Sequence, residues 1–281
     1  MRRGVRDPRP AARSLAVLAL HRTAWLASFS VVALGAYVVS PLAHAARVAA
    51  RVASTDQSGA PFNGTAAVGA LFTRSGSKLG AHFCTASVVS SPAGNLLITA
   101  AHCMQGKSLG PATGVAFAPG YHNGRFPHGI WVVRAVYVDS AWAQDQNPDD
   151  DVAFLIAGRP GTDIQRSTGA ETLRIDRPPQ MVQVIGYPDA TNRPITCMAK
   201  ALSFGARQMV FDCDGYTNGT SGGPFLAHVS ATTGEGWVIG VIGGYEQGGD
   251  TPNVSYSPRF FAAVRALYET AISESSISLS G

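Results

Sequence analysis

Short apolar stretches separated by turn-forming residues are the feature that most restricts the fold of this chain. Each stretch has the length of a β-strand, and β-branched residues are frequent in it. The stretches cover residues 67–72, 85–89, 96–99, 131–133, 152–156, 181–185, 209–211 and 237–242. Glycine and proline interrupt the chain between them, for example at 91–94 and 159–161. This pattern predicts an all-β fold, either a barrel or a sandwich.

The C-terminal part differs from the rest in its periodicity. Apolar residues recur at helical spacing from about residue 258 to residue 273, which predicts one α-helix there. The apolar stripe consists of Phe260, Phe261, Val264, Leu267 and Tyr268. Residues 274–281 are expected to form a tail.

The N-terminus has the pattern of an export signal. Arginines lie within residues 2–22, an uncharged apolar run covers 24–39, and Ala43-His44-Ala45 follows. This order predicts a signal peptide over 1–45 with cleavage after Ala45, and therefore secretion. A retained membrane anchor is the alternative, since the run nearly has spanning length. Residues 46–64, rich in Ala, Ser and Gly, are expected to be a linker or a short pro-segment.

Charge is distributed unevenly along the chain. The formal net charge is +4, but residues 1–45 hold six arginines and only one aspartate, so the remaining chain is slightly acidic. Without a basic run in that remainder, a nucleic-acid partner is not expected. Only 14% of residues are charged, with 31 Gly and 17 Pro, which argues against a coiled coil or a charged disordered protein.

Four cysteines, all beyond the predicted signal peptide, imply disulfides in an oxidising compartment. Three pairings are possible. We expect the sequence-local one, Cys84–Cys103 with Cys197–Cys213, which closes two short loops. A zinc site is not expected, because the chain has no CxxC pair.

Three segments carry residues suited to nucleophilic catalysis. His102 follows an apolar stretch and precedes Cys103, Asp151 precedes another apolar stretch, and Ser221 lies among glycines within 218–224. Glycine allows the backbone to turn sharply and a substrate to approach closely. Together the three residues supply a base, an orienting acid and a nucleophile.

The order of these residues separates three kinds of hydrolase. Residues 219–223 also match the G-x-S-x-G motif of α/β-hydrolases, but that fold requires the order Ser, acid, His. After Ser221 the chain has only His228, with no acid between the two. The subtilisin order fails as well, because Asp56 is the only acid between the signal and His102. The observed order is that of the chymotrypsin type.

Three blocks resemble the signature segments of trypsin/chymotrypsin-like serine peptidases. They are Thr99-Ala100-Ala101-His102-Cys103, Asp151-Val152-Ala153-Phe154-Leu155 and Gly219-Thr220-Ser221-Gly222-Gly223-Pro224. The pair Tyr187-Pro188 resembles sequences of the bacterial secreted branch of this family, which includes the V8-like glutamyl endopeptidases.

This resemblance extends over about residues 65–272 and implies a fold. The implied fold is chymotrypsin-like, with two antiparallel β-barrels and a C-terminal α-helix. The site would lie in the cleft between the two barrels. Barrel one would cover about 65–165, barrel two about 175–257, and the helix about 258–273. The family also pairs the cysteine after its histidine with one upstream, which agrees with Cys84–Cys103.

The resemblance also implies a role for each site residue. Asp151 would orient His102, His102 would take the proton of Ser221, and Ser221 would attack a peptide carbonyl. The backbone N–H groups of Gly219 and Ser221 would form the oxyanion hole. Substrate-binding residues would be Gly215, Asn218, Gly243, Gly244 and Tyr245.

Two positions depart from the trypsin pattern. Trypsin-like zymogens are activated when a new N-terminal amine pairs with an Asp just before the nucleophile. Here that position is Thr220, so this ion pair is not expected. Gly215 stands six residues before Ser221, where trypsin has an acid, and the primary specificity stays open.

The implied function is a secreted serine endopeptidase, a hydrolase that acts on protein or peptide substrates. We expect a monomer without metal or organic cofactor, and without stable membrane association once the signal is removed. Two alternatives stay open. One is a secreted esterase on the same scaffold, and the other is an inactive homologue that acts as a binding module.

Overall fold

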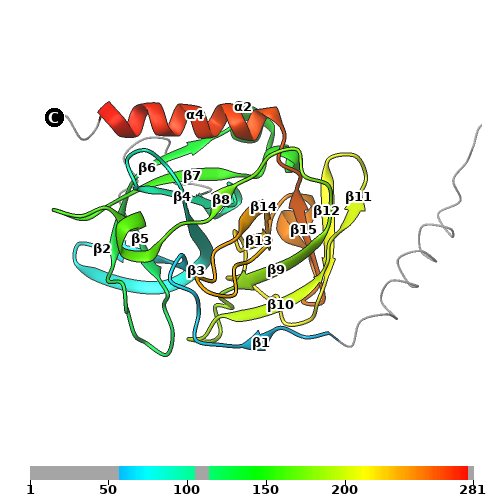
Figure 1. Cartoon of the computed structure of the whole chain (residues 1–281), viewed down its shortest axis with the longest axis horizontal. Helices are drawn as coiled ribbons and strands as arrows, with labels where there is room; N and C mark the ends of the chain where they lie inside the picture. Colours follow the sequence, from blue (N-terminus) through cyan, green and yellow to red (C-terminus); the bar gives the residue numbers. More distant parts are fainter. Residues whose placement is uncertain (1–56, 105–113, 278–281) are drawn as a thin grey trace, which may run out of the picture. The chain divides into compact units, whose positions relative to one another are not determined.

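The computed structural model describes residues 57–104 and 114–277 of the chain (Figure 1). The predicted signal peptide over 1–45 lies outside these residues, as do most of the predicted linker and the last residues of the predicted tail. Among the described residues, no helix is both long and apolar enough to cross a membrane.

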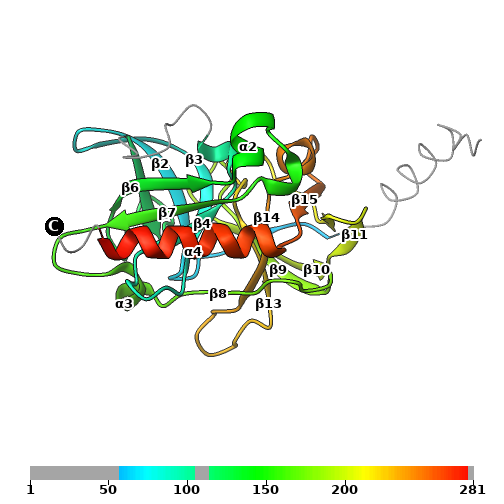
Figure 2. The same cartoon turned by 90° about the horizontal axis from the view of Figure 1, so that it is seen from above.

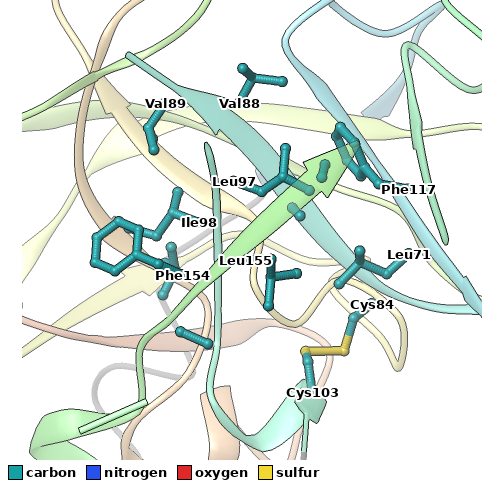
Figure 3. Close-up of a cluster of buried hydrophobic side chains, with 14 of the residues drawn as sticks. Leu71, Cys84, Val88, Val89, Leu97, Ile98, Cys103, Phe117, Phe154 and Leu155 are labelled. Atoms are coloured by element: carbon teal, nitrogen blue, oxygen red, sulfur yellow. A yellow bond between two sulfur atoms is a disulfide. The ribbon is translucent and has the colours of Figure 1, made fainter. Parts of the chain in front are cut away.

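Six antiparallel strands close into a barrel in the order β2-β3-β4-β7-β6-β5. We call this unit barrel one. Its strands are β2 (Val68–Ser75), β3 (Lys78–Val89), β4 (Leu96–Thr99), β5 (Val115–Pro119), β6 (Trp131–Val138) and β7 (Ala153–Gly158). The interior is apolar, with Leu71, Leu97, Phe117 and Leu155 fully buried (Figure 3). Closure removes free strand edges and leaves the loops at the barrel ends to carry function.

The second β-unit contains two sheets around a separate apolar cluster that includes Val184, Phe211 and Phe225. The six-stranded sheet has the order β1-β10-β9-β13-β14-β8, and the three-stranded sheet has the order β11-β12-β15. Their strands are β1 (Ala60–Pro61), β8 (Thr172–Leu173), β9 (Met181–Gly186), β10 (Ile195–Lys200), β11 (Leu202–Phe204), β12 (Gln208–Asp212), β13 (Pro224–Ala227), β14 (Trp237–Val241) and β15 (Val254–Pro258). Strand β8 pairs with β14 in parallel, whereas the other pairs are antiparallel.

Helix α4 (Ala262–Ile277) lies along β6 and β7 on the outside of barrel one (Figures 1 and 2). Val264 is buried, and the Tyr268 ring packs edge-on against Phe154 at 5.7 Å between centroids. The helix begins four residues later than expected and also ends four residues later, so residues 274–277 belong to the helix and not to the predicted tail. Pro258, the last residue of β15, is still paired with Gln208 of β12, so the helix can begin only after β15 ends.

Two short helices were not expected from the sequence. They are α2 (Ser140–Asp145) and α3 (Ile164–Thr168), and each is too short to show a period. Both begin at an aspartate whose side chain accepts a backbone N–H, Asp139 from Ala141 and Asp163 from Arg166. Apart from these additions, the prediction of an all-β fold with one C-terminal helix is confirmed.

Candidate active site

Pairing of β4 with β7 brings His102 and Asp151 together. Thr99, at the end of β4, is opposite Ala153, at the start of β7. His102, which follows β4, and Asp151, which precedes β7, therefore lie at the same edge of the barrel. After β4, the 3₁₀ turn η1 (His102–Met104) presents the histidine. Before β7, the 3₁₀ turn η2 (Pro148–Asp150) ends at Asp151. The fold therefore places an imidazole beside a carboxylate.

The carboxylate of Asp151 has no exposed surface and accepts three hydrogen bonds. Its Oδ1 accepts from the backbone N–H of His102 at 2.8 Å. Its Oδ2 accepts from His102 Nδ1 at 2.7 Å and from the backbone N–H of Gly244 at 2.8 Å. A carboxylate only accepts, so Nδ1 of His102 carries the hydrogen and Nε2 is left to take a proton.

The neighbouring Asp150 has different surroundings. Its carboxylate accepts from the Asn147 side chain at 2.7 Å and lies 3.9 Å from the Arg207 guanidinium. Burial, together with the nearby carboxylates of Asp139 and Asp149, raises the pKa of Asp150. Of the adjacent acids, Asp151 is therefore the one that contacts the histidine.

The loop that carries Ser221 is held by its own backbone and by the second β-unit. Gly222 N–H donates to Ile242 O at 2.7 Å, and Gly223 N–H donates to Thr220 O at 2.9 Å. Thr220 is buried, and its hydroxyl donates to Thr217 O at 2.7 Å. The hydroxyl thus supports the loop in a position where trypsin uses an aspartate.

Glycine is required at position 219 for two reasons. Its φ is +91°, which other residues rarely adopt, and a Cβ there would lie 2.5 Å from both Asp189 N and Tyr187 O. Among the described residues, neither the N–H of Gly219 nor that of Ser221 donates a hydrogen bond. Both groups are therefore available to bind an anionic oxygen.

Barrel one also holds this loop, through Thr85 of β3. The Thr85 hydroxyl donates to Gly219 O at 3.0 Å and accepts from Tyr187 N–H at 2.9 Å. The backbone N–H of Thr85 donates to Ser221 O at 2.7 Å, and its carbonyl accepts from the Thr99 hydroxyl at 2.7 Å. The role of Thr85 was missed by the sequence reasoning, because a buried threonine in a strand has no local signature.

His102 and Ser221 line one cavity of about 980 Å³, together with both halves of the Cys84–Cys103 disulfide. Of the residues expected to bind substrate, Asn218 lines this cavity. Gly243 and Gly244 lie against the Asp151 carboxylate instead.

The other two expected substrate-binding residues lie outside the cavity lining. Gly215 is next to Gly59 and Ile195, beside strand β1. The ring of Tyr245 packs against Phe204 and Tyr256, each 5.0 Å away between centroids.

The lining of this cavity is acidic. Asp189, Glu246 and Asp250 belong to it, and none of its described residues is a lysine or arginine. We call the part with Glu246 and Asp250 the acidic wall. Glu246 and Gln247 belong to the turn η3 (Tyr245–Gly248) and have left-handed φ values of 51° and 52°. The sequence reasoning missed this wall, although the glycine pairs at 243–244 and 248–249 mark an unusual turn.

Both disulfides join cysteines that are close in sequence, Cys84 with Cys103 and Cys197 with Cys213. Ligand atoms of Cys84, His102 and Cys103 lie within 4.8 Å of one another. The two sulfurs are bonded to each other, however, and cannot act as thiolate ligands. This group therefore offers a metal ion only one nitrogen.

Residues 84–241 match the family model described as trypsin-like peptidase domain. The chain belongs to this family. As a trypsin-like peptidase, it is a serine-type hydrolase, and its substrates are proteins or peptides. A comparison with curated proteins finds no match to this chain.

Solved structures similar to this trypsin-like peptidase include other serine proteases. The protease Anisep from Arthrobacter nicotinovorans has 23% identity and a TM-score of 0.65, over 76% of this chain and 98% of that chain. The thermostable serine protease AL20 from an extremophilic microorganism has 25% identity and a TM-score of 0.63, over 74% of this chain and 98% of that chain. A Glu endopeptidase in complex with MPD has 15% identity and a TM-score of 0.59, over 78% of this chain and 98% of that chain.

Proposed function

We propose that this trypsin-like peptidase is a secreted endopeptidase in which His102, Asp151 and Ser221 form the catalytic triad. The observation that carries the proposal is the buried Asp151 carboxylate, which binds both the backbone N–H and ring Nδ1 of His102. His102 and Ser221 line the same cavity, so a substrate bound there can meet both groups.

The proposed mechanism has two halves. His102 Nε2 takes the proton of the Ser221 hydroxyl as its oxygen attacks the peptide carbonyl, and then gives that proton to the leaving amine. Water then attacks the acyl carbon of the resulting acyl-enzyme as His102 Nε2 takes a proton from the water. His102 returns that proton to the Ser221 oxygen as the acyl–oxygen bond breaks and the carboxylic acid product leaves. The N–H groups of Gly219 and Ser221 stabilise the oxyanion in each half, where one such donor is typically worth about 2.7–4 kcal/mol.

Secretion is part of the proposal. The N-terminal pattern of charge, apolar run and small residues before Ala46 supports export. Two disulfides support an oxidising compartment, because thiols are kept reduced in most cytosols. Detection of mature protein in the medium, with an N-terminus after Ala45, tests this part. Recovery of the full-length chain in the membrane fraction would favour the anchor instead.

Labelling with a fluorophosphonate probe tests the nucleophile. The unaltered protein should be labelled, Ser221→Ala should not, and the exposed Ser203→Ala should be labelled normally. Absence of labelling in the unaltered protein would favour an inactive homologue. Casein and a p-nitrophenyl ester, assayed side by side, separate the peptidase from an esterase, which would turn over only the ester.

A further inference from the structure

Three hollows follow the loop between β3 and β4, residues 90–95. The first, of about 620 Å³, is lined by Arg134, Arg159 and Arg166 together with Ala93 and Asn95. The second, of about 280 Å³, shares Ala93, Asp163 and Arg166 with the first. The third, of about 450 Å³, begins at Ser90. The first two hollows therefore adjoin each other, and the third is linked to the second through the neighbouring residues Ser90 and Ser91.

Arginines dominate both ends of this series. Arg174, Arg177 and Arg265 line the third hollow. We call the six residues Arg134, Arg159, Arg166, Arg174, Arg177 and Arg265 the arginine track. Asp163 and Glu269 are the acidic residues that line the hollows. The described residues as a whole hold more carboxylates than lysines and arginines, so the track is a local concentration of positive charge.

Most of this charge is not neutralised within the protein. Among the described residues, Arg166 is the track member that forms an ion pair, at 3.3 Å from Asp163. Arg174 and Arg177 both lie over the ring of Trp237, at 5.0 and 5.1 Å from its centroid. The two guanidiniums repel each other, and an anion bound beside them would offset this repulsion.

Two buried polar groups at the track lack partners. The Nε of Arg174 is buried and has no hydrogen-bond partner among the described residues. Asn95 is 8% exposed, and its Oδ1 also lacks one. A buried polar group without a partner costs free energy, and such groups usually indicate a missing ligand or water. One of them lies at each end of the track. The Arg174 N–H can donate to an anionic oxygen, whereas Asn95 Oδ1 only accepts and would need a donor such as a sugar hydroxyl.

We propose that the arginine track binds a linear polyanion, namely an acidic polysaccharide with sulfate or carboxylate groups along its chain. Guanidinium groups match such oxyanions with paired hydrogen bonds. The spread of arginines over three consecutive hollows suits a polymer with repeated charges better than one small anion.

The aromatic residues next to the track, Trp237 and Tyr268, favour a polysaccharide over a nucleic acid. The Trp237 ring is covered by two guanidiniums and by His228 at 4.3 Å. Tyr268 packs against Phe154, and its hydroxyl donates to Ser90 O at 2.9 Å. Trp237 is thus crowded by three cationic or aromatic groups, whereas single-stranded nucleic acids are usually bound by stacking of bases on free aromatic faces.

The track is separate from the catalytic cavity, since none of the residues that the structure describes lines both. A bound polysaccharide would therefore hold the peptidase on a charged surface while the cavity stays open to substrate.

Binding of dextran sulfate to the purified protein, measured by isothermal titration at low salt, tests the proposal. The doubles Arg134→Gln/Arg159→Gln and Arg177→Gln/Arg265→Gln should each weaken binding about 2- to 30-fold. The control double Lys78→Gln/Lys200→Gln removes the same charge outside the track and should leave the affinity unchanged. Thermal unfolding shows whether each variant is folded. If a double variant does not fold, the single variant Arg265→Gln, at an exposed position, is tested in its place.

Three results would overturn the proposal. They are no measurable binding at low salt, equal weakening by the control double, and tighter binding of single-stranded DNA than of dextran sulfate or polygalacturonate at equal charge. The two polysaccharides distinguish sulfate from carboxylate recognition. Raising the salt concentration should weaken true binding, since exposed charges are screened over about 10 Å at 0.1 M.

Discussion

The hydroxyl of Thr85 donates a hydrogen bond to the carbonyl oxygen of Gly219 at 3.0 Å, across 134 positions of the chain. The first residue belongs to barrel one and the second to the loop of the proposed nucleophile. The same hydroxyl accepts from Tyr187 N–H. One side chain therefore couples the proposed oxyanion hole to the opposite barrel.

Thr85→Val should reduce kcat more than it raises KM, because it removes the hydrogen bond that positions Gly219. It also leaves the Tyr187 N–H unpaired in a buried place, at a cost of about 1–3 kcal/mol in unfolding free energy. Thr85→Ser keeps the hydroxyl and should retain activity. Steady-state kinetics and urea unfolding check both variants. Equal kinetics for the valine and serine variants would show that Thr85 does not position the loop.

The proposed triad predicts a graded loss of activity. Ser221→Ala and His102→Ala should abolish turnover without loss of fold. Asp151→Asn should lower kcat by about 10⁴, a value taken from the chymotrypsin-type template itself. Asp150→Asn is the matched control, since that carboxylate contacts Asn147 rather than His102. If the two asparagine variants exchanged these effects in a peptide assay, the acid would be Asp150.

The two disulfides should differ in their effect on activity. Each closes a loop of similar length, with sequence separations of 19 and 16, so removal of either should cost about 3 kcal/mol. Cys84→Ser/Cys103→Ser should also lower kcat/KM strongly, because Cys103 follows His102 and both cysteines line the cavity. Cys197→Ser/Cys213→Ser should affect kcat/KM less. Non-reducing peptide mapping that linked Cys84 to Cys197 would contradict this pairing.

Glu171 should make the folded state less stable as the pH rises. Burial raises the pKa of its carboxyl from 4.5 to about 8, so between these values the unfolded chain has lost a proton that the folded chain keeps. Stability therefore falls from about pH 5 to pH 8 through this group.

Glu171→Gln should remove this dependence. From pH 4 to pH 9, the unfolding free energy of the variant should therefore rise by a few kcal/mol relative to that of the unaltered protein. Urea unfolding at both pH values measures the change, and exposed Glu274→Gln serves as the control. Parallel stability curves for the Glu171 variant and the unaltered protein would show that folding does not raise the pKa of Glu171.

The N-terminus should not act as a switch of the trypsin type. Thr220 has no charge to pair with an amine, and its hydroxyl already donates to Thr217 O. Chains that begin at Ala46 or at Gln57, both of which keep β1 paired with β10, should therefore cleave a peptide substrate with comparable kcat/KM. Activity confined to one of these chains, and lost on acetylation of its amine, would reveal an N-terminal contact.

The strands of barrel one were largely predictable because their residues are apolar and β-branched. Leu96–Thr99 is a continuous buried run between turn residues, and its strand was found where expected. By contrast, β11 (Leu202–Phe204) is short and partly exposed, and β8 has only two residues, which pair with β14 in parallel. Such strands exist through tertiary pairing, which leaves no local pattern in the sequence.

The proposed triad could be found from the sequence because each of its residues lies in a short segment with a recognisable neighbour. His102 precedes a cysteine, and Ser221 lies between glycines. The acidic wall made by Glu246 and Asp250 could not be found in this way, because it depends on the left-handed turn at Glu246 and Gln247. Backbone conformation at non-glycine residues of this kind follows from the packing around them.

Gly222 limits how this peptidase can evolve. Its φ is +79°, and a Cβ there would overlap with Thr99 Oγ1 and Thr85 O, both of barrel one. Any larger residue would need compensating changes in a part of the chain encoded far upstream. Recombination that exchanged one β-unit between distant homologues would therefore join surfaces that had not adapted to each other. Inheritance should favour transfer of the two units as a single block.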